Sequence, residues 1–227
     1  MQLAKPHLDI GLFTNRRDAH LTFWREVAGL QFDHMAKLGG GIHQYRFFAN
    51  GSIIKVNDSR AALPAVAPAG IVQLMIARPD AGPPTEVTDP DGNQVALVPR
   101  GERGINGIGI KLAVNDLVVS GNFYAGAMGM ERAGVHAYRC GDSLIVLQPS
   151  VQPLTRPEYR GLGFRYLTVQ VHDCDAAHAA ILSLGGLEGR PPLTLGETAR
   201  FSFVRDPDGN WIEISERRSL TGKALRD

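Results

Sequence analysis

Residues 206–214 read Asp-Pro-Asp-Gly-Asn-Trp-Ile-Glu-Ile, and residues 89–97 read Asp-Pro-Asp-Gly-Asn-Gln-Val-Ala-Leu. In each copy the proline fixes φ at the first position of a turn, and the glycine supplies the positive φ needed to start the next strand. Polar and apolar side chains then alternate with the period of a strand. Two such segments, separated by half the length of the chain, indicate an internal duplication.

The composition is that of an ordinary soluble globular protein, because 44% of the 227 residues are hydrophobic and 21% are charged. The formal net charge is +1 and no run of lysine or arginine stands out, so we expect binding neither to nucleic acid nor to a membrane. Cys140 and Cys174 form no Cys-x-x-Cys pair, which favours a reducing compartment. Without a secretory or membrane-spanning stretch, we expect a cytoplasmic protein.

The first half of the chain shows one strand, one helix and three further strands. Residues 8–12 alternate as a half-buried strand, and the helix should run from an Asn15 cap to Gly29. Three strands are predicted at 31–35, 42–48 and 52–56, with the hairpin signal Asn50-Gly51 between the last two. Another strand follows at 71–76, but the proline-rich residues 78–84 exclude a helix, so this second unit is expected to be truncated.

The second half repeats this plan after three glycines in residues 100–107, which mark the expected domain boundary. We predict a strand at 108–114, a helix capped by Asn115-Asp116, and strands at 131–135, 136–140 and 143–148. A fourth unit begins with a strand at 164–171 and a helix capped by Asp173 or Asp175. The strands 199–204 and 206–215 then complete the sheet. The predicted parts are a domain at 1–100, a linker at 101–107, a domain at 108–218 and a tail at 219–227.

This order, with helices that close on Trp24 or Tyr124 and a glycine, resembles the vicinal oxygen chelate superfamily, which includes glyoxalase I, bleomycin resistance proteins and extradiol dioxygenases. The resemblance covers nearly the whole chain as four βαβββ units. It implies an α+β fold of glyoxalase-like paired modules, whose curved antiparallel sheets form half-barrel cups. In the superfamily a divalent metal lies in a cup, held by side chains from the first and last strands of paired units.

The residues at these implied ligand positions depend on which units share a cup. If each half forms its own cup, one presents Asp9, Lys55, Ile71 and Ala96, and the other presents Gly109, Val146, Tyr166 and Glu213. If unit one pairs with unit four, the converging set is His7, Asp9, Lys55, Tyr166 and Glu213. A lysine ammonium repels a cation, so we expect no cofactor. The alternative is Zn, Ni, Mn or Fe held by His7, Asp9 and Glu213.

Each candidate has a catalytic and a structural interpretation. Glu213 is the candidate general base, with Lys55 or Tyr166 next to a developing oxyanion and Asp9 orienting the lysine. The alternatives are a solvated carboxylate for Glu213, a plain ion pair for Asp9 and Lys55, a surface histidine for His7 and an apolar wall for Tyr166. We predict that four further side chains contact the substrate: Arg46, Tyr45, Trp211 and Phe201. Their structural alternatives are salt bridging for the arginine and packing for the aromatic residues.

Three functions remain open from the sequence. The first is a glyoxalase-like enzyme that acts on a small oxygenated molecule by lyase or isomerase chemistry through an enolate-like intermediate. The second is a non-catalytic small-molecule binder of the bleomycin-resistance type, which the loss of metal positions favours. The third is an extradiol-type dioxygenase, which would need two histidines and a carboxylate on iron. The expected partner is a small molecule, and the expected assembly is a monomer or a homodimer.

Overall fold

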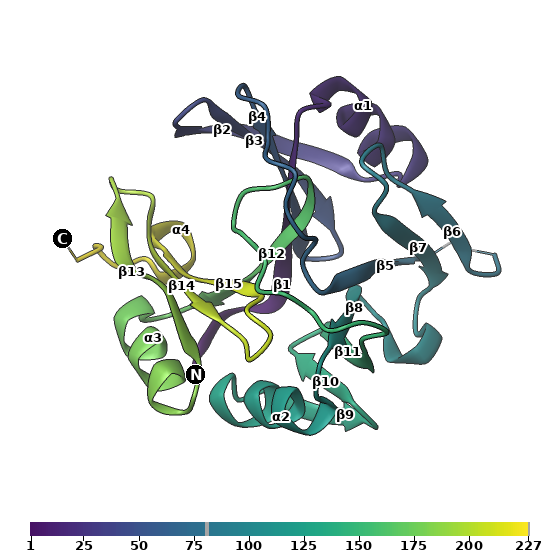
Figure 1. Cartoon of the computed structure of the whole chain (residues 1–227). Helices are drawn as coiled ribbons and strands as arrows, with labels where there is room; N and C mark the ends of the chain where they lie inside the picture. Colours follow the sequence, from purple (N-terminus) through teal and green to yellow (C-terminus); the bar gives the residue numbers. More distant parts are fainter. Residues whose placement is uncertain (80–81, 227) are drawn as a thin grey trace.

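Two curved sheets form the centre of the molecule, and helices cover their outer sides (Figure 1). The computed structural model describes residues 1–79 and 82–226. The eight-stranded sheet has the order β13-β14-β15-β12-β1-β4-β3-β2, and the seven-stranded sheet has the order β6-β7-β5-β8-β11-β10-β9. The α+β class with glyoxalase-like curved sheets is therefore confirmed.

The eight-stranded sheet combines the first and the fourth unit of the sequence repeat. Its strands are β1 (Leu3–Thr14), β2 (Gln31–Gly39), β3 (Ile42–Ala49), β4 (Ser52–Ser59), β12 (Gly163–Val171), β13 (Leu187–Leu195), β14 (Ala199–Arg205) and β15 (Trp211–Arg217). The seven-stranded sheet combines the second and third units through β5 (Ile71–Arg78), β6 (Thr85–Thr88), β7 (Gln94–Pro99), β8 (Ile108–Val114), β9 (Glu131–Gly134), β10 (Ala137–Cys140) and β11 (Ser143–Pro149).

The first strands of different units join the halves of each sheet. β1 pairs antiparallel with β12 in one sheet, and β5 pairs antiparallel with β8 in the other. Of the pairings that the sequence left open, unit one therefore shares a sheet with unit four. Each sheet takes strands from both sides of residues 101–107, so the predicted domains 1–100 and 108–218 do not coincide with the two sheets.

The helices follow the cap signals with one exception. Asp116 caps α2 (Leu117–Asn122) by accepting from Val118 N and Val119 N, and Asp173 caps α3 (Cys174–Ser183). In unit one, α1 (Arg17–Thr22) starts after Arg16, because the Asn15 side chain instead binds the backbone of residues 59–63. α1 and α2 each continue into a π-helical turn, η1 (Phe23–Val27) and η3 (Phe123–Ala127).

Two strands of the structure were not expected from the sequence. The first, β13, contains Pro191 and Pro192, which disfavour a central strand, but β13 lies at the edge of its sheet, where a strand tolerates proline. The short edge strand β6 was likewise missed. In the truncated second unit the described residues form no helix between β5 and β7, and residues 80 and 81 lie outside the described part.

The C-terminal end of the chain is more regular than the predicted tail. β15 continues to Arg217, a helical turn α4 (Arg218–Thr221) follows it, and Asp227 lies outside the described residues. The remaining short helix, the 3-10 turn η2 (Glu102–Gly104), lies in the predicted linker. No helix among residues 1–79 and 82–226 is long and apolar enough to cross a membrane.

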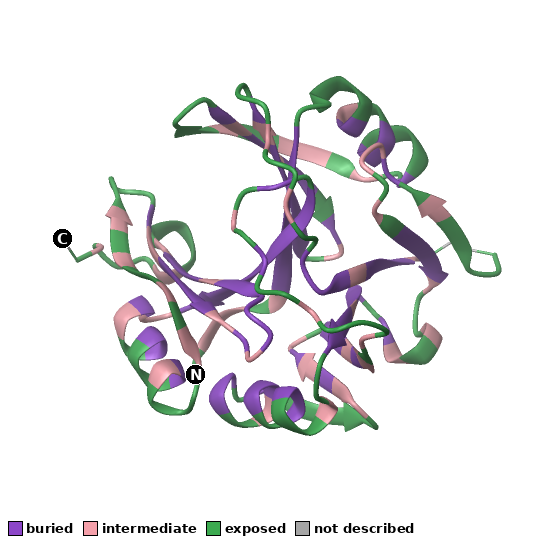
Figure 2. Cartoon of the chain, in the orientation of Figure 1, coloured by how far each residue is buried: buried purple, intermediate pink, exposed green. Residues whose placement is uncertain are grey.

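The main hydrophobic core lies between the sheets and their covering helices (Figure 2). Trp24 and Tyr124, the two helix-closing aromatic residues, are fully buried in it. Both Asp-Pro-Asp-Gly turns pack against the helix of the preceding unit: Asp91 contacts His20 of α1 at 2.9 Å, and Asp206 accepts from Tyr124 of η3 at 2.9 Å. Because each turn and its helix belong to different sheets, these contacts tie the two sheets together.

Candidate functional site

The concave face of the eight-stranded sheet brings four of the predicted site residues together. Register places Asp9 opposite Thr168, and Thr168 opposite Glu213. In the next row, Gly11 lies opposite both Tyr166 and Lys55. Since alternate residues of a strand face the same side of a sheet, Asp9, Lys55, Tyr166 and Glu213 all point into one cup.

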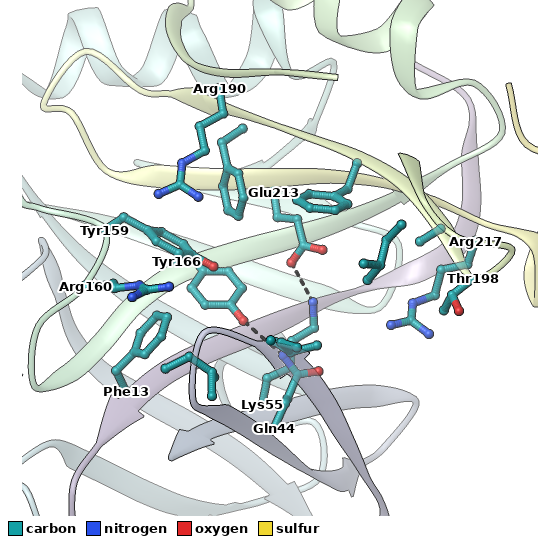
Figure 3. A pocket seen from close by; sticks show the side chains of 17 residues that line it. Phe13, Gln44, Lys55, Tyr159, Arg160, Tyr166, Arg190, Thr198, Glu213 and Arg217 are labelled. Carbon is teal, nitrogen blue, oxygen red and sulfur yellow. Dashed lines mark hydrogen bonds and ion pairs between the residues drawn. The ribbon is translucent and has the colours of Figure 1, made fainter. Parts of the chain in front are cut away.

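A hydrogen-bonded chain of Lys55, Thr168 and Glu213 forms the polar centre of this cup. Figure 3 shows the contact between Lys55 and Glu213. Lys55 Nζ donates to Thr168 Oγ1 and to Glu213 Oε2, each at 2.7 Å, and Thr168 Oγ1 donates to the same Glu213 oxygen at 2.8 Å. Burial lowers the pKa of Lys55 below its usual 10.5, and the carboxylates of Glu213 and Asp9 offset only part of this effect. The pair is therefore a largely desolvated cation beside a more accessible carboxylate.

Asp9 is fully buried beneath this chain, and both of its oxygens have partners. Oδ1 accepts from Lys5 Nζ at 2.6 Å and from Ile53 N at 2.9 Å, and Oδ2 accepts from Gln170 Nε2 at 3.1 Å. Burial alone would raise the pKa of Asp9, but the charges of Lys5 and Lys55 together with the hydrogen bonds lower it. Asp9 is thus a fixed anion that stabilises the neighbouring lysine charges.

Tyr166 lies against the backbone of β1, where a glycine makes room for its ring. A Cβ atom added to Gly11 would overlap the ring. The phenol oxygen accepts from Asn57 Nδ2 at 3.1 Å and from Gln44 Nε2 at 3.4 Å, and burial raises its pKa well above 10. Tyr166 therefore stays protonated, and its hydroxyl proton can be donated to a ligand.

These side chains border a pocket of about 180 Å³ that opens between the β2–β3 hairpin, the β13–β14 hairpin and the loop before β12. One wall is aromatic: Tyr159 packs edge-on against Phe13 and Phe203, with ring centroids 5.3 and 4.8 Å apart. Its charged lining comprises four cations and one carboxylate: Lys55, Arg160, Arg190, Arg217 and Glu213. The pocket is therefore strongly positive, although the whole chain carries a formal charge of only +1.

The donor set does not suit a divalent metal ion. The ammonium of Lys55 lies within hydrogen-bond distance of Glu213, where it would repel a cation bound to that carboxylate. Asp9 directs its oxygens to Lys5, Ile53 and Gln170. Across residues 1–79 and 82–226, no cluster of three or more histidine, cysteine or acidic side chains is arranged to hold a metal.

The other predicted contact residues lie at varying distances from the pocket. Phe201 lines it, whereas Trp211 packs behind Phe203 and donates through Nε1 to Pro157 O at 2.9 Å. Arg46 is buried near the pocket and donates to Gln44 Oε1 at 3.0 Å. Tyr45 lies on the opposite face of β3 against Phe32.

His7 does not join the centre of the cup. Its Nδ1 atom lies 3.9 Å from Asp142 Oδ2, and its ring packs against Gly51. The proposed metal ligands His7, Asp9 and Glu213 are therefore not gathered around one point.

Sequence reasoning missed several residues of the pocket. Arg217 lies four residues after Glu213 on the same strand, so the two-residue period of β15 places both on the same face. Thr168 follows Tyr166 by the same rule. Arg190 had no such signal, because the register of β13 shifts on both sides of it and the strand itself was not predicted. Tyr159 and Arg160 come from a loop whose course only tertiary packing decides.

The second cup, on the seven-stranded sheet, is filled by apolar side chains. Ile105, from the predicted linker, is 1% exposed and packs with Met75, Ala96 and Leu144. A Cβ atom added to Gly109 would lie 2.8 Å from Ile105 Cδ1. The implied ligand positions of this cup are thus part of a small hydrophobic core.

Comparison with solved structures shows the same fold over almost the entire chain. A glyoxalase I variant from Zea mays superposes with a TM-score of 0.73 at 15% identity, covering 99% of this chain and 96% of that chain. A proposed dioxygenase from Bacillus subtilis gives a TM-score of 0.73 at 16% identity over 99% and 92%. The cppA protein from Streptococcus pneumoniae gives 0.56 at 10% identity over 95% and 100%.

Comparison by sequence agrees with this fold. A search of curated proteins found no significant match. Residues 105–214, which include the fourth unit and its Asp-Pro-Asp-Gly strand, match the family model described as Glyoxalase/Bleomycin resistance protein/Dioxygenase superfamily. The second half of the chain thus matches this superfamily, which is the vicinal oxygen chelate superfamily, and the whole chain has the same fold as the solved glyoxalase I and dioxygenase structures.

Proposed function

We propose that this protein is an enzyme that moves a proton at a carbon atom beside a carbonyl group in a small oxygenated molecule, through an enolate-like intermediate. Lyase or isomerase chemistry of this kind needs a base next to the C–H bond and a positive charge next to the carbonyl oxygen. The observation that carries the proposal is the chain of Lys55, Thr168 and Glu213 at the centre of the pocket.

Glu213 is the base in this proposal. Both hydrogen bonds that it accepts within the described chain end on Oε2, so its other oxygen is available to a ligand. Thr168 and Lys55 hold the carboxylate in one orientation, which keeps Oε1 directed for proton transfer. The C–H bond breaks, its proton passes to Oε1, and its electron pair moves toward the carbonyl oxygen.

Lys55 stabilises the negative charge that develops on that oxygen. An ammonium group has three N–H donors, and Thr168 and Glu213 accept from two of them. The third N–H is therefore available to the substrate oxygen, in a site where burial strengthens the interaction. The protonated hydroxyl of Tyr166 is a second donor in the same cup. When Glu213 returns the proton to a carbon atom, the carbonyl group re-forms.

In this proposal Lys55 supplies the positive charge, so the activity needs no added metal. We expect the protein purified without chelator to show no stoichiometric zinc, nickel, manganese or iron by elemental analysis. Dialysis against EDTA should leave the exchange activity described below unchanged. A metal present in stoichiometric amount and lost in Glu213→Ala or Asp9→Ala would contradict the proposal.

Hydrogen exchange with solvent tests the chemistry directly. The protein is incubated in D₂O with a panel of small 2-oxo and 2-hydroxy acids, and NMR follows deuterium at the carbon bonded to a carbonyl group, which is C3 of the 2-oxo acids and C2 of the 2-hydroxy acids. We expect exchange with wild type, and a loss of about 100-fold or more in Glu213→Gln, the scale of positioned acid–base catalysis. Glu216→Gln is the matched control, because Glu216 lies on the same strand but binds the start of α3. Exchange that persists in Glu213→Gln would exclude Glu213 as the base.

A non-catalytic binder is the second candidate, and the aromatic wall around Tyr159 favours it. The pocket volume of about 180 Å³ is below the roughly 300–1,000 Å³ of sites for drug-sized molecules, which favours a small ligand over a bulky antibiotic. If the protein is a binder, its ligand should raise the melting temperature. A hundredfold excess of ligand over Kd should stabilise the folded state by about 2.7 kcal/mol, and no hydrogen exchange should occur at the ligand's carbon atoms.

The third candidate, extradiol-type dioxygenase chemistry, has little support from the pocket. It needs two histidines and a carboxylate around iron. The residues described as lining the pocket include Glu213 but no histidine.

A further inference from the structure

We infer that the substrate carries two carboxylate groups, one bound by Arg217 and the other by Arg190 and Arg160, on opposite sides of the Lys55–Glu213 pair. This inference rests on the proposed function for the position of the reacting carbon, and it adds the chemical class of the substrate. Three arginines line the pocket, and in the described chain none of them has a carboxylate or carbonyl partner.

Arg217 is the clearest of the three. Its Nε atom is buried without a hydrogen-bond partner, whereas the next residue, Arg218, forms an exposed ion pair with Glu197 at 2.9 Å. Burial and the nearby charge of Arg46 lower the pKa of Arg217. A guanidinium group placed in this way lacks an anion, and its planar N–H donors match both oxygens of a carboxylate.

Arg190 and Arg160 form the second positive group. Arg190 holds its guanidinium over aromatic rings, with Cζ 4.7 Å from the ring centre of Tyr159 and 5.8 Å from that of Phe203. Stacking of this kind fixes the plane of the guanidinium group and leaves its N–H edges free. Arg160 comes from the same loop as Tyr159 and borders the same side of the pocket (Figure 3).

The two positive groups lie in different directions from Glu213. Arg190 is opposite Phe203, which is opposite Glu213, so two strand spacings, about 9–10 Å, separate their backbones across the sheet. Arg217 is four residues along β15 from Glu213, about 13 Å at the backbone. Figure 3 shows Arg190 and Arg160 on one side of the Lys55–Glu213 pair and Arg217 on the other.

A ligand with a single anionic group would neutralise only one of these two groups. A ligand bound only by the exposed Arg190 and Arg160 would leave Arg217 unpaired, with its Nε atom buried, where a lone charge is costly. A ligand bound only by Arg217 would make no charge-assisted contact with Arg190 and Arg160. A diacid pairs with both, and its central carbons then lie next to Glu213 and Lys55. The modest pocket volume suits a short organic diacid.

Calorimetric titration of the whole protein with unbranched acids tests this inference. The probes are glutarate and adipate, each compared with the monoacid of the same carbon number, valerate and hexanoate. We expect the better diacid to bind about 10–100-fold more tightly than its monoacid, as for one added charge-assisted contact. Equal affinity of diacids and monoacids would overturn the inference.

Substitutions then assign the two groups. Arg217→Gln and Arg190→Gln should each weaken diacid binding about 10–100-fold, to the level of the monoacid, and should leave monoacid binding much less affected. Arg190→Lys, which keeps the charge, should retain part of the preference, and melting curves check folding. Arg218→Gln is the matched control for Arg217→Gln. Arg205→Gln is the matched control for Arg190→Gln, because the guanidinium group of Arg205 stacks on Trp211 and Arg205 does not line the pocket. Unchanged diacid binding in both pocket variants would contradict the assignment.

One further variant separates this inference from the proposed function. Glu213→Gln keeps both arginine groups, so it should bind the diacid at least as tightly as wild type. Diacid binding without any hydrogen exchange in wild type would uphold the inference and reject the enzymatic function. Exchange that proceeds equally well with monoacids, and is unaffected by Arg217→Gln and Arg190→Gln, would reject the inference and uphold the function.

Discussion

At the scale of single residues, Lys55 and Glu213 form an ion pair whose two side chains differ in their exposure to solvent. The side chain of Lys55 is 2% exposed, whereas that of Glu213 is 15% exposed. A buried ammonium that loses its carboxylate remains an uncompensated charge, which usually costs more than the net stabilisation from the pair. A pair kept at the centre of a pocket under these conditions is more consistent with a functional role than with stabilisation of the fold.

A double-mutant cycle in urea tests this difference. Glu213→Gln should destabilise the protein by about 1–3 kcal/mol, because Lys55 loses its charged partner but keeps Thr168 and the nearby Asp9. Lys55→Met should remove the buried charge, so Lys55→Met/Glu213→Gln should be more stable than Glu213→Gln alone. Additive effects in the double variant would mean that the two side chains do not interact in solution.

Gly11 is a second residue that determines the geometry of the site, because its missing side chain leaves room for the Tyr166 ring. We expect Gly11→Ala to destabilise the protein by about 1–3 kcal/mol, because its Cβ overlaps the Tyr166 ring and pushes it into the pocket. Ligand binding should weaken as well. Gly109→Ala in β8 is the matched control, since its Cβ meets the ends of Ile105 and Met75, which can move. If Gly11→Ala and Gly109→Ala destabilise the protein equally and ligand binding is unchanged, the position of the Tyr166 ring does not depend on Gly11.

At the scale of elements, the Asp-Pro-Asp-Gly turn both reverses the chain and packs against a helix of the neighbouring unit. In the second copy, the carboxylate of Asp206 accepts four hydrogen bonds, from Asp208 N, Asn210 N, Asn210 Nδ2 and Tyr124 Oη. Burial nevertheless raises the pKa of Asp206 to about 6, against the effect of the hydrogen bonds from Asn210 and Tyr124. The turn thus places a carboxyl group of raised pKa where the helix of unit three meets the last strand.

This raised pKa predicts a pH dependence of stability. Because the folded pKa lies above the unfolded value of 3.8, the stabilisation is fully present below about pH 4 and is lost as the pH rises through about 6. The change amounts to about 3 kcal/mol. The stability of wild type relative to Asp206→Asn should therefore fall between pH 4 and pH 7, as measured by urea unfolding at each pH.

Asp9→Asn provides a control of opposite sign. The pKa of Asp9 is lowered in the folded protein, so its stabilisation is present above about pH 4 and is lost as the pH falls. Relative to this variant, wild type should lose stability toward acid pH. Parallel pH curves for the two variants would contradict the assigned environments of both carboxylates.

At the scale of the whole molecule, the pairing of units makes the two halves of the chain depend on each other. β1 from the first half of the chain pairs with β12 from the second half, and β5 from the first half pairs with β8 from the second. In each sheet, the two strands that join the units therefore come from different halves of the chain. The candidate site likewise takes Lys55 from unit one and Glu213 from unit four. Separation of the halves would expose a central strand edge in each fragment and divide the site.

Fragment complementation tests this dependence. Fragments 1–104 and 105–227, divided inside the predicted linker, should each lack cooperative unfolding when alone, because each loses the partner of a central strand. Mixing them should restore the native circular dichroism spectrum and a complex of the full mass by size-exclusion chromatography. Cooperative unfolding of either fragment alone would instead support the predicted domains 1–100 and 108–218 as independent units.

Sequence patterns predicted the order of strands and helices because the relevant signals are local, and the resemblance to the superfamily then implied the curved sheets. The Asp-Pro-Asp-Gly turns, the alternation in strands such as residues 108–114 and the caps Asp116 and Asp173 each depend on a few neighbouring residues. The resemblance to the superfamily placed Glu213 at a cup position of the last strand, and the two-residue period of that strand would then have placed Arg217, four residues later, on the same face. β13 escaped prediction because its prolines and register shifts erase that period.

The sequence by itself therefore determined the four repeated units, their order and the polar residues that each strand directs toward a concave face. Only the tertiary structure decided that unit one shares its sheet with unit four, that Ile105 fills the other cup, and that Arg190, Arg160 and Arg217 surround the Lys55–Glu213 pair. The physical reason is that a strand pattern selects a face but not a partner. The choice among distant partners depends on how much apolar surface the whole molecule buries, and no local stretch of sequence contains that quantity.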